Sequence, residues 1–180
     1  LQIDSPRRSF FTLGAAAETS VRQKSTMELF EEFSQLVKEF KKEKIEYALC
    51  GGLAMAVYAF PRATLDIDIL IEPETLEKAK SIAKKLGFAF DAGLMRFSND
   101  AIQIHRLTKI IPGLSDVLML DMLLLTSEIK EVWETKQILI WDQGDLPVVS
   151  PRGLIKLKSM RLSGQDQDDI NNLKSIIDED

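Results

Sequence analysis

A diglycine at the end of an apolar segment, followed by two aspartates one residue apart, is the feature that most constrains how this chain folds. Gly51 and Gly52 end the apolar segment, and Asp66 and Asp68 stand within residues 65–71, where apolar and acidic residues alternate. Residues two apart on a strand point to the same face, so this segment is expected to be a strand with one apolar and one acidic face. Glycine lets a backbone approach a phosphate closely. Paired carboxylates beside such a gap are what phosphoryl chemistry with a divalent metal requires.

The composition favours one compact domain. The chain has 180 residues, of which 45% are apolar and 28% charged. This length is enough for one domain with a sizeable core but short for two domains that each bury a core of their own. Its single cysteine excludes an intramolecular disulfide and a cysteine-based zinc site, and it fits a reducing compartment such as the cytoplasm. No apolar run approaches the roughly 20 residues that a membrane-spanning helix needs, so no membrane contact is expected.

The first residues are set apart from this domain. Met27 resembles a natural start, so residues 1–26 are expected to be a leader or an added segment that is poorly ordered. Residues 27–180 are expected to form the single domain.

Local patterning predicts the order of helices and strands. Helical spacing of apolar residues, together with capping residues, prolines and glycines, indicates the helices, and alternating or short apolar runs indicate the strands. The helices are expected at residues 25–42, 53–60, 73–86, 150–162 and 166–177, and the strands at 45–50, 65–71, 95–97, 102–105, 116–125, 138–141 and 146–149. Two pairs of strands, 95–97 with 102–105 and 138–141 with 146–149, are expected to form hairpins. The pattern predicts an α+β fold, a mixed β-sheet flanked by helices.

Three segments, taken together and in this order, resemble a known superfamily. The Gly51-Gly52 loop, the segment Arg62-x-Thr64-x-Asp66-Ile67-Asp68 and a later apolar strand with one more aspartate resemble the DNA polymerase β nucleotidyltransferases. The tail, with Leu154-Ile155-x-Leu157-Lys158 and then Gln165-Asp166-x-x-Asp169-Ile170, is similar to the C-terminal signature of minimal prokaryotic members of the AbiEii and MNT type. The resemblance covers roughly residues 45–175. It implies a polymerase β palm-like nucleotidyltransferase fold.

The resemblance also implies a metal site. In this superfamily three carboxylates on adjacent strands hold two Mg²⁺ ions, or Mn²⁺ in their place, around the α-phosphate of an NTP. Asp66 and Asp68 match the paired ligands, which are catalytic as well as metal-binding. Asp121 is chosen as the third, and Asp116 is its competitor. The two lie five residues apart, so on one regular strand they face opposite sides and only one of them serves.

Nucleotide-binding roles carry over to five further positions. The backbone N–H groups of Gly51 and Gly52 would hold the β- and γ-phosphates, without the serine hydroxyl that many members have at the second position. Arg62 would clamp a phosphate, Thr64 would orient the loop before the catalytic strand, and Lys158 would approach the triphosphate. Each has a plainer interpretation: a tight turn for the glycines, an ion pair for Arg62 and a surface lysine for Lys158.

Two functions follow from these observations. The first is a Mg²⁺-dependent enzyme that moves a nucleoside monophosphate from an NTP to a hydroxyl acceptor and releases pyrophosphate. The acceptor is a protein side chain, a tRNA or a small molecule; the net charge of −5 disfavours nucleic acid without excluding a local basic patch. The second is an antitoxin-like or regulatory module with weak or lost catalysis. Under this second hypothesis, an apolar face of the first helix, with Phe30, Phe33 and Phe40, binds a protein partner or a second copy of the chain. The plainer interpretation is that this face belongs to the hydrophobic core.

Overall fold

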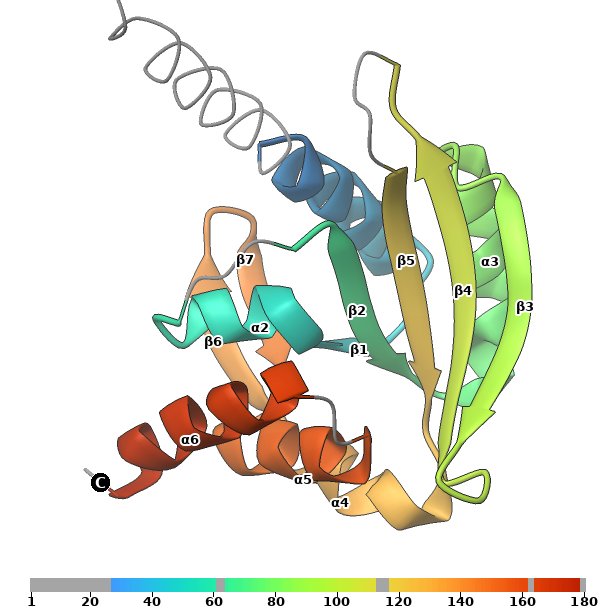
Figure 1. The fold of residues 1–180 in the computed structure, drawn as a ribbon. Coiled ribbons are helices and arrows are strands. Elements are labelled where there is room, and N and C mark those ends of the chain that lie inside the picture. Colours follow the sequence, from blue (N-terminus) through green and yellow to red (C-terminus); the bar gives the residue numbers. More distant parts are fainter. Residues whose placement is uncertain (1–26, 61–63, 113–116, 162–163, 179–180) are drawn as a thin grey trace, which may run out of the picture.

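The computed structural model describes residues 27–60, 64–112, 117–161 and 164–178 (Figure 1). Its strands are β1 (Tyr47–Cys50), β2 (Asp66–Ile71), β3 (Phe90–Phe97), β4 (Ile102–Ile110), β5 (Val117–Leu124), β6 (Gln137–Trp141) and β7 (Gly144–Val148). Residues 27–42 are helical, and the later helices are α2 (Gly51–Val57), α3 (Leu76–Lys85), α4 (Lys130–Glu134), α5 (Pro151–Arg161) and α6 (Gly164–Asp178), with short 3-10 turns η1 (Pro73–Thr75) and η2 (Ser127–Ile129).

All the described strands form one seven-stranded sheet in the order β3-β4-β5-β2-β1-β7-β6. The sheet is mixed, because β2 pairs with β5 and β1 with β7 in parallel, whereas the other neighbours are antiparallel. The prediction of an α+β fold with a mixed sheet flanked by helices is confirmed. Both expected hairpins, β3–β4 and β6–β7, are present.

Helices cover both faces of the sheet. Figure 1 shows α3 and the helix over residues 27–42 on one side, with α2 and α5 on the other and α6 beside α5. Alternation along β2 divides the two layers: Ile67, Ile69 and Ile71 are fully buried on the side of α3, while Asp66 and Asp68 point to the side of α2 and α5 and are only partly buried. The acidic face expected from the sequence is therefore turned toward one layer of helices.

The apolar face of the first helix belongs mostly to the core. Phe33 and Phe40 are each 1% exposed and pack their rings against Tyr47 of β1, whereas Phe30 is 44% exposed. The prediction of a partner or dimer surface that uses all three phenylalanines is wrong, because two of them are buried against the sheet.

Several boundaries differ from the sequence predictions. The diglycine, expected as a loop, forms the first turn of α2, and this helix ends at Val57 instead of residue 60. The β3–β4 hairpin is longer than expected, and η2 and α4 were not predicted because they are too short for a helical period to show. The predictions for segment 1–26, Arg62 and Asp116 lie outside the described residues. Among the described residues, no helix is long and apolar enough to cross a membrane.

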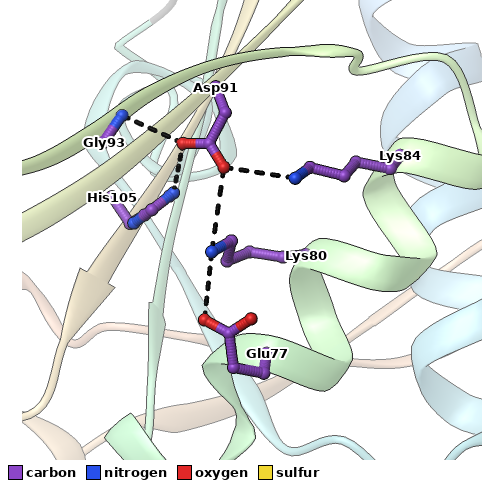
Figure 2. A network of polar contacts seen from close by, with 6 residues as sticks. All are labelled: Glu77, Lys80, Lys84, Asp91, Gly93 and His105. Carbon is purple, nitrogen blue, oxygen red and sulfur yellow. Dashed lines mark hydrogen bonds and ion pairs between the residues drawn. The ribbon is translucent and has the colours of Figure 1, made fainter.

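A polar network joins α3 to β3 and β4 (Figure 2). One carboxylate oxygen of Asp91 accepts hydrogen bonds from the N–H of Gly93 at 2.9 Å and pairs with His105 Nε2 at 2.7 Å. The other lies 3.2 Å from Lys84 Nζ and 3.7 Å from Lys80 Nζ. Burial alone would raise the pKa of Asp91, but the bonds from Gly93, His105 and Lys84 outweigh it and lower the pKa to about 2.

Candidate active site

Strand register places four residues in one row across the sheet. Asp68 of β2 is paired with Cys50 of β1 on one side and with Asp121 of β5 on the other. Asp121 is paired in turn with Arg106 of β4. Because paired residues on neighbouring strands point to the same face, the two carboxylates and the guanidinium lie side by side on the sheet.

A cavity of about 550 Å³ opens above this row, between the sheet and α5. Asp66, Asp68, Asp121 and Arg106 line its charged part from the sheet. The rest of the lining comes from strand and turn residues and from α5, namely Cys50, Gly51, Phe97, Ser98, Ile102, Ile104, Leu123, Leu154, Leu157, Lys158, Met160, Arg161 and Asp166. The cavity thus combines an acidic floor with an apolar wall, as a pocket for a small polar ligand commonly does.

Asp68 lies at the centre of the charged part. Burial, and then the nearby negative charges of Asp121 and Asp66, raise its pKa to about 7, against a smaller opposing effect of Arg161 and of the Gly52 N–H that hydrogen-bonds to it. Burial and the neighbouring carboxylates thus both disfavour the charged form of Asp68. Perturbed groups of this kind in a cavity are typical of functional sites.

Arg106 holds Asp121 with both of its facing nitrogens. Its Nε donates to one oxygen of Asp121 and its Nη2 donates to the other, each at 2.7 Å. The Asp121 side chain is 4% exposed and that of Arg106 is 30% exposed, so the pair is largely withdrawn from water. Hydrogen bonding to Asp121 raises the pKa of Arg106, and Asp66 and Asp68 add to this electrostatically. One guanidinium therefore acts on all three carboxylates.

The two glycines fit closely against the site. Gly51 has a φ of +62°, and a Cβ placed there would lie 1.9 Å from Oδ2 of Asp68. A Cβ at Gly52 would lie 3.0 Å from the Thr64 side chain. The Oγ1 of Thr64 also accepts a hydrogen bond from the N–H of Asp66 at 3.2 Å, where β2 begins. The diglycine thus has a packing role: it lets the start of α2 approach the carboxylate strand.

Lys158 on α5 is buried and paired within the C-terminal pair of helices. Its Nζ lies 2.6 Å from Asp169 and 3.4 Å from Asp166, both on α6. The lysine and the two aspartates of the tail signature are therefore in contact with one another, and Lys158 and Asp166 also line the cavity. In this arrangement the ammonium joins α5 to α6 beside the carboxylate cluster.

Comparison with known proteins identifies the family. Residues 13–133, more than half of the chain, match the sequence model of a family described as an uncharacterised nucleotidyltransferase. The chain belongs to this nucleotidyltransferase family. The matched range contains the whole carboxylate cluster and Arg106 but not α5 or α6. A comparison with the curated proteins finds no match.

Two solved structures share the fold of this family member. One is a Thermotoga maritima protein assigned to the nucleotidyltransferases, with 20% identity, a TM-score of 0.54, and coverage of 85% of this chain and 94% of that one. The other is the antibiotic-resistance factor ANT(2'')-Ia, with 12% identity, a TM-score of 0.56, and coverage of 85% of each chain. At these identities the likeness establishes the fold.

Most of the site residues expected from the sequence are placed together in this family member. Gly51, Asp66, Asp68, Asp121 and Lys158 all line the cavity. Gly52 and Thr64 contact the carboxylate strand without lining the cavity, and Arg62 lies outside the described residues.

Sequence reasoning missed two basic residues of the cavity, Arg106 and Arg161. Arg161 follows Lys158 by three residues on one helix, a spacing that puts both on the same face and gave a usable signal. Arg106 gave none, because its contact with Asp121 depends on the register between β4 and β5.

The donor chemistry of the cluster fits a divalent cation. Asp66, Asp68 and Asp121 offer carboxylate oxygens, the ligands that Mg²⁺ and Mn²⁺ prefer, and all three line the same cavity. Over the described ranges, however, no group of three or more His, Cys, Asp or Glu side chains is arranged to hold a metal ion. Both oxygens of Asp121 are engaged by Arg106. The donor atoms suit a divalent ion. In this structure, however, the guanidinium of Arg106 holds the carboxylate of Asp121.

Proposed function

We propose that this protein is a Mg²⁺-dependent nucleotidyltransferase that moves a nucleoside monophosphate from an NTP to a hydroxyl acceptor. The observation that carries the proposal is the cluster of Asp66, Asp68 and Asp121 on one face of the sheet, at the floor of a 550 Å³ cavity. Membership of a nucleotidyltransferase family supports it. We place the three aspartates in the role of metal ligands, with Mn²⁺ as an alternative ion.

The reaction needs positioning and charge stabilisation. The acceptor oxygen bonds to the α-phosphorus, the bond from that phosphorus to the oxygen bridging the β-phosphate breaks, and pyrophosphate leaves with its electron pair. The acceptor's proton passes to a carboxylate of the cluster. Bound Mg²⁺ would supply Lewis-acid stabilisation of the charge on the transferring and leaving groups. Among the chain's own residues, Arg161 and Lys158 face the cavity as cations for phosphate oxygens, and the Gly51-Gly52 turn shapes the approach.

We assign the protein to the minimal AbiEii/MNT-like group within the superfamily. The contact of Lys158 with Asp166 and Asp169 supports this, because it gives the three charged residues of the tail signature a common structural role. The acceptor is a protein side chain, a tRNA or a small molecule. Toxin–antitoxin pairing with another protein is part of this subtype proposal and depends on surfaces other than Phe33 and Phe40, which are buried.

The test is an assay of transfer with each of the four NTPs, labelled at the α-phosphate, with Mg²⁺ or with chelator. Pyrophosphate release and label incorporation into the protein itself, into tRNA and into a small-molecule mixture are measured for wild type and Asp66→Asn. We expect release that requires Mg²⁺ and is lost in the variant. Equal release by wild type and Asp66→Asn, or release that persists in chelator, would overturn the proposed function.

A further inference from the structure

The bidentate pair of Arg106 and Asp121 stands in the most acidic part of the cavity. Its two bonds of 2.7 Å occupy both oxygens of Asp121, whose side chain is 4% exposed. A guanidinium fork matches a carboxylate or a phosphate in the same geometry, which a lysine does not. Arg106 therefore has two chemically equivalent partners available in a site that receives a triphosphate.

The same guanidinium supplies charge to the rest of the cluster. Asp66 and Asp68 line the same cavity as Arg106, and Asp68 stands beside Asp121 on the neighbouring strand. Cationic charge near these carboxylates relieves their repulsion, and a divalent ion would relieve it more strongly than one guanidinium. A divalent ion that bound Asp121 would stand beside the guanidinium at the same two oxygens, where repulsion between the two cations opposes joint occupancy.

We propose that Arg106 is a latch: it holds Asp121 as the resident counter-cation, and it yields the carboxylate to the divalent ion when the nucleotide enters. The released guanidinium then pairs with a phosphate of the nucleotide. This inference rests on the proposed function, since it takes Asp121 as a metal ligand. Arg106 acts in it as a positioning residue that keeps metal affinity low until a nucleotide arrives.

The latch predicts how removing the arginine changes metal binding in the absence of any nucleotide. Arg106→Gln frees both oxygens of Asp121, so the affinity for Mn²⁺ alone should rise by about tenfold, within the range typical of coupled sites. The readout is a Mn²⁺ titration followed by electron paramagnetic resonance of the free ion, which requires no activity. Arg96→Gln is the matched control: Arg96 is an arginine of the neighbouring strand β3, 53% exposed, and it pairs with Asp100 instead.

Two further variants keep the test decisive. Arg106→Lys retains a cation that cannot engage both oxygens, so it should bind Mn²⁺ more tightly than wild type but less tightly than Arg106→Gln, and it carries the test if Arg106→Gln does not fold. Arg106→Gln with Asp121→Asn removes the contested carboxylate and should lose the gain. Unchanged or weaker Mn²⁺ binding in folded Arg106→Gln or Arg106→Lys would overturn the latch.

The outcome is separable from that of the proposed function. If wild type binds NTP with Mg²⁺ but the Arg106 variants bind Mn²⁺ no better, the latch is wrong and the nucleotidyltransferase proposal stands. If wild type neither binds nor turns over any NTP, the proposed function falls, and a gain of Mn²⁺ affinity in Arg106→Gln would still establish competition between the two cations at Asp121.

Discussion

Two aspartates on the two sides of the sheet differ sharply in their surroundings. Asp91, between the sheet and α3, accepts a hydrogen bond from the N–H of Gly93, pairs with His105 and forms ion pairs with two lysines, and its pKa falls to about 2 (Figure 2). Asp68, at the floor of the cavity, has two acidic neighbours, and its pKa rises to about 7. The first arrangement satisfies a charge and stabilises the fold. The second buries a carboxyl beside two others, which disfavours its charged form in the folded protein.

The largest effect is expected from Asp68→Asn. We expect nucleotidyl transfer to fall by at least about a hundredfold, because a metal-ligating carboxylate contributes several kcal/mol of charge stabilisation. The melting temperature in chelator should stay the same or rise, since the variant removes a charge that the folded state disfavours. Transfer rates and thermal unfolding are measured on the same preparations. A variant that keeps full transfer, or that unfolds at a much lower temperature, would break the contrast between the two aspartates.

The second largest effect is expected from a substitution at Gly51, where α2 lies close to Asp68 of β2. Gly51→Ala places a Cβ within 1.9 Å of the Asp68 carboxylate and imposes a left-handed φ on alanine. We expect a loss of about 3 kcal/mol in the free energy of unfolding, from overpacking and backbone strain together. Urea denaturation measures it. Gly144→Ala is the control, because Gly144 also has positive φ but has nothing near its Cβ position; it should cost about 1 kcal/mol. If both variants lost the same free energy of unfolding, the predicted clash between the Cβ at position 51 and Asp68 would be contradicted.

A smaller effect is expected on the satisfied side of the sheet. Asp91→Asn weakens the bonds to His105 and the lysines of α3, so the free energy of unfolding should fall by about 1–2 kcal/mol. Nucleotidyl transfer should be unchanged, because the network faces away from the cavity. Urea unfolding measures the loss, and Asp100→Asn, at an exposed ion pair 3.5 Å long, should change it little. A transfer defect in Asp91→Asn with normal stability would contradict the division of roles.

The two aspartates should also give opposite pH dependence in chelator. For Asp91 the folded pKa lies below the ordinary 3.8, so the stability advantage of wild type over Asp91→Asn is full above about pH 4 and is lost as the pH falls to about 2. For Asp68 the folded pKa lies above 3.8, so the stability of wild type relative to Asp68→Asn falls as the pH rises from about 4 to about 7. Urea titrations across pH 2–8 measure both differences, and slopes of the same sign would contradict the opposite shifts.

Much of the fold could be predicted from the sequence because its signals are local. Alternation over residues 65–71 gave β2 and its acidic face, and turn residues gave the two hairpins. Short elements such as α4 have too few residues for a period, and the helical start at Gly51 is not favoured by glycine's propensity. A helix or strand can be predicted from the sequence where it is long enough for several residues to repeat its pattern.

The site was predictable only in its parts. Asp66 and Asp68 share a strand, so spacing sufficed for them. The pairing of Asp121 with Arg106, two residues fifteen positions apart in sequence, depends instead on the register between two strands. Lys158 was expected near a triphosphate, and the structure pairs it with Asp169 of the tail signature, a contact that was not predicted. Contacts between elements decide such partners, and no single-sequence pattern encodes them.

The central claim, that Asp66, Asp68 and Asp121 form a metal–nucleotide site, is tested most directly by a thermal-shift panel of the four NTPs, each with Mg²⁺ and with chelator, on wild type and Asp66→Asn. Binding to the folded state raises the melting temperature by mass action. The account predicts a rise in wild type that requires both Mg²⁺ and an NTP and disappears in Asp66→Asn. No rise with any nucleotide, or the same rise in the variant or in chelator, would contradict it.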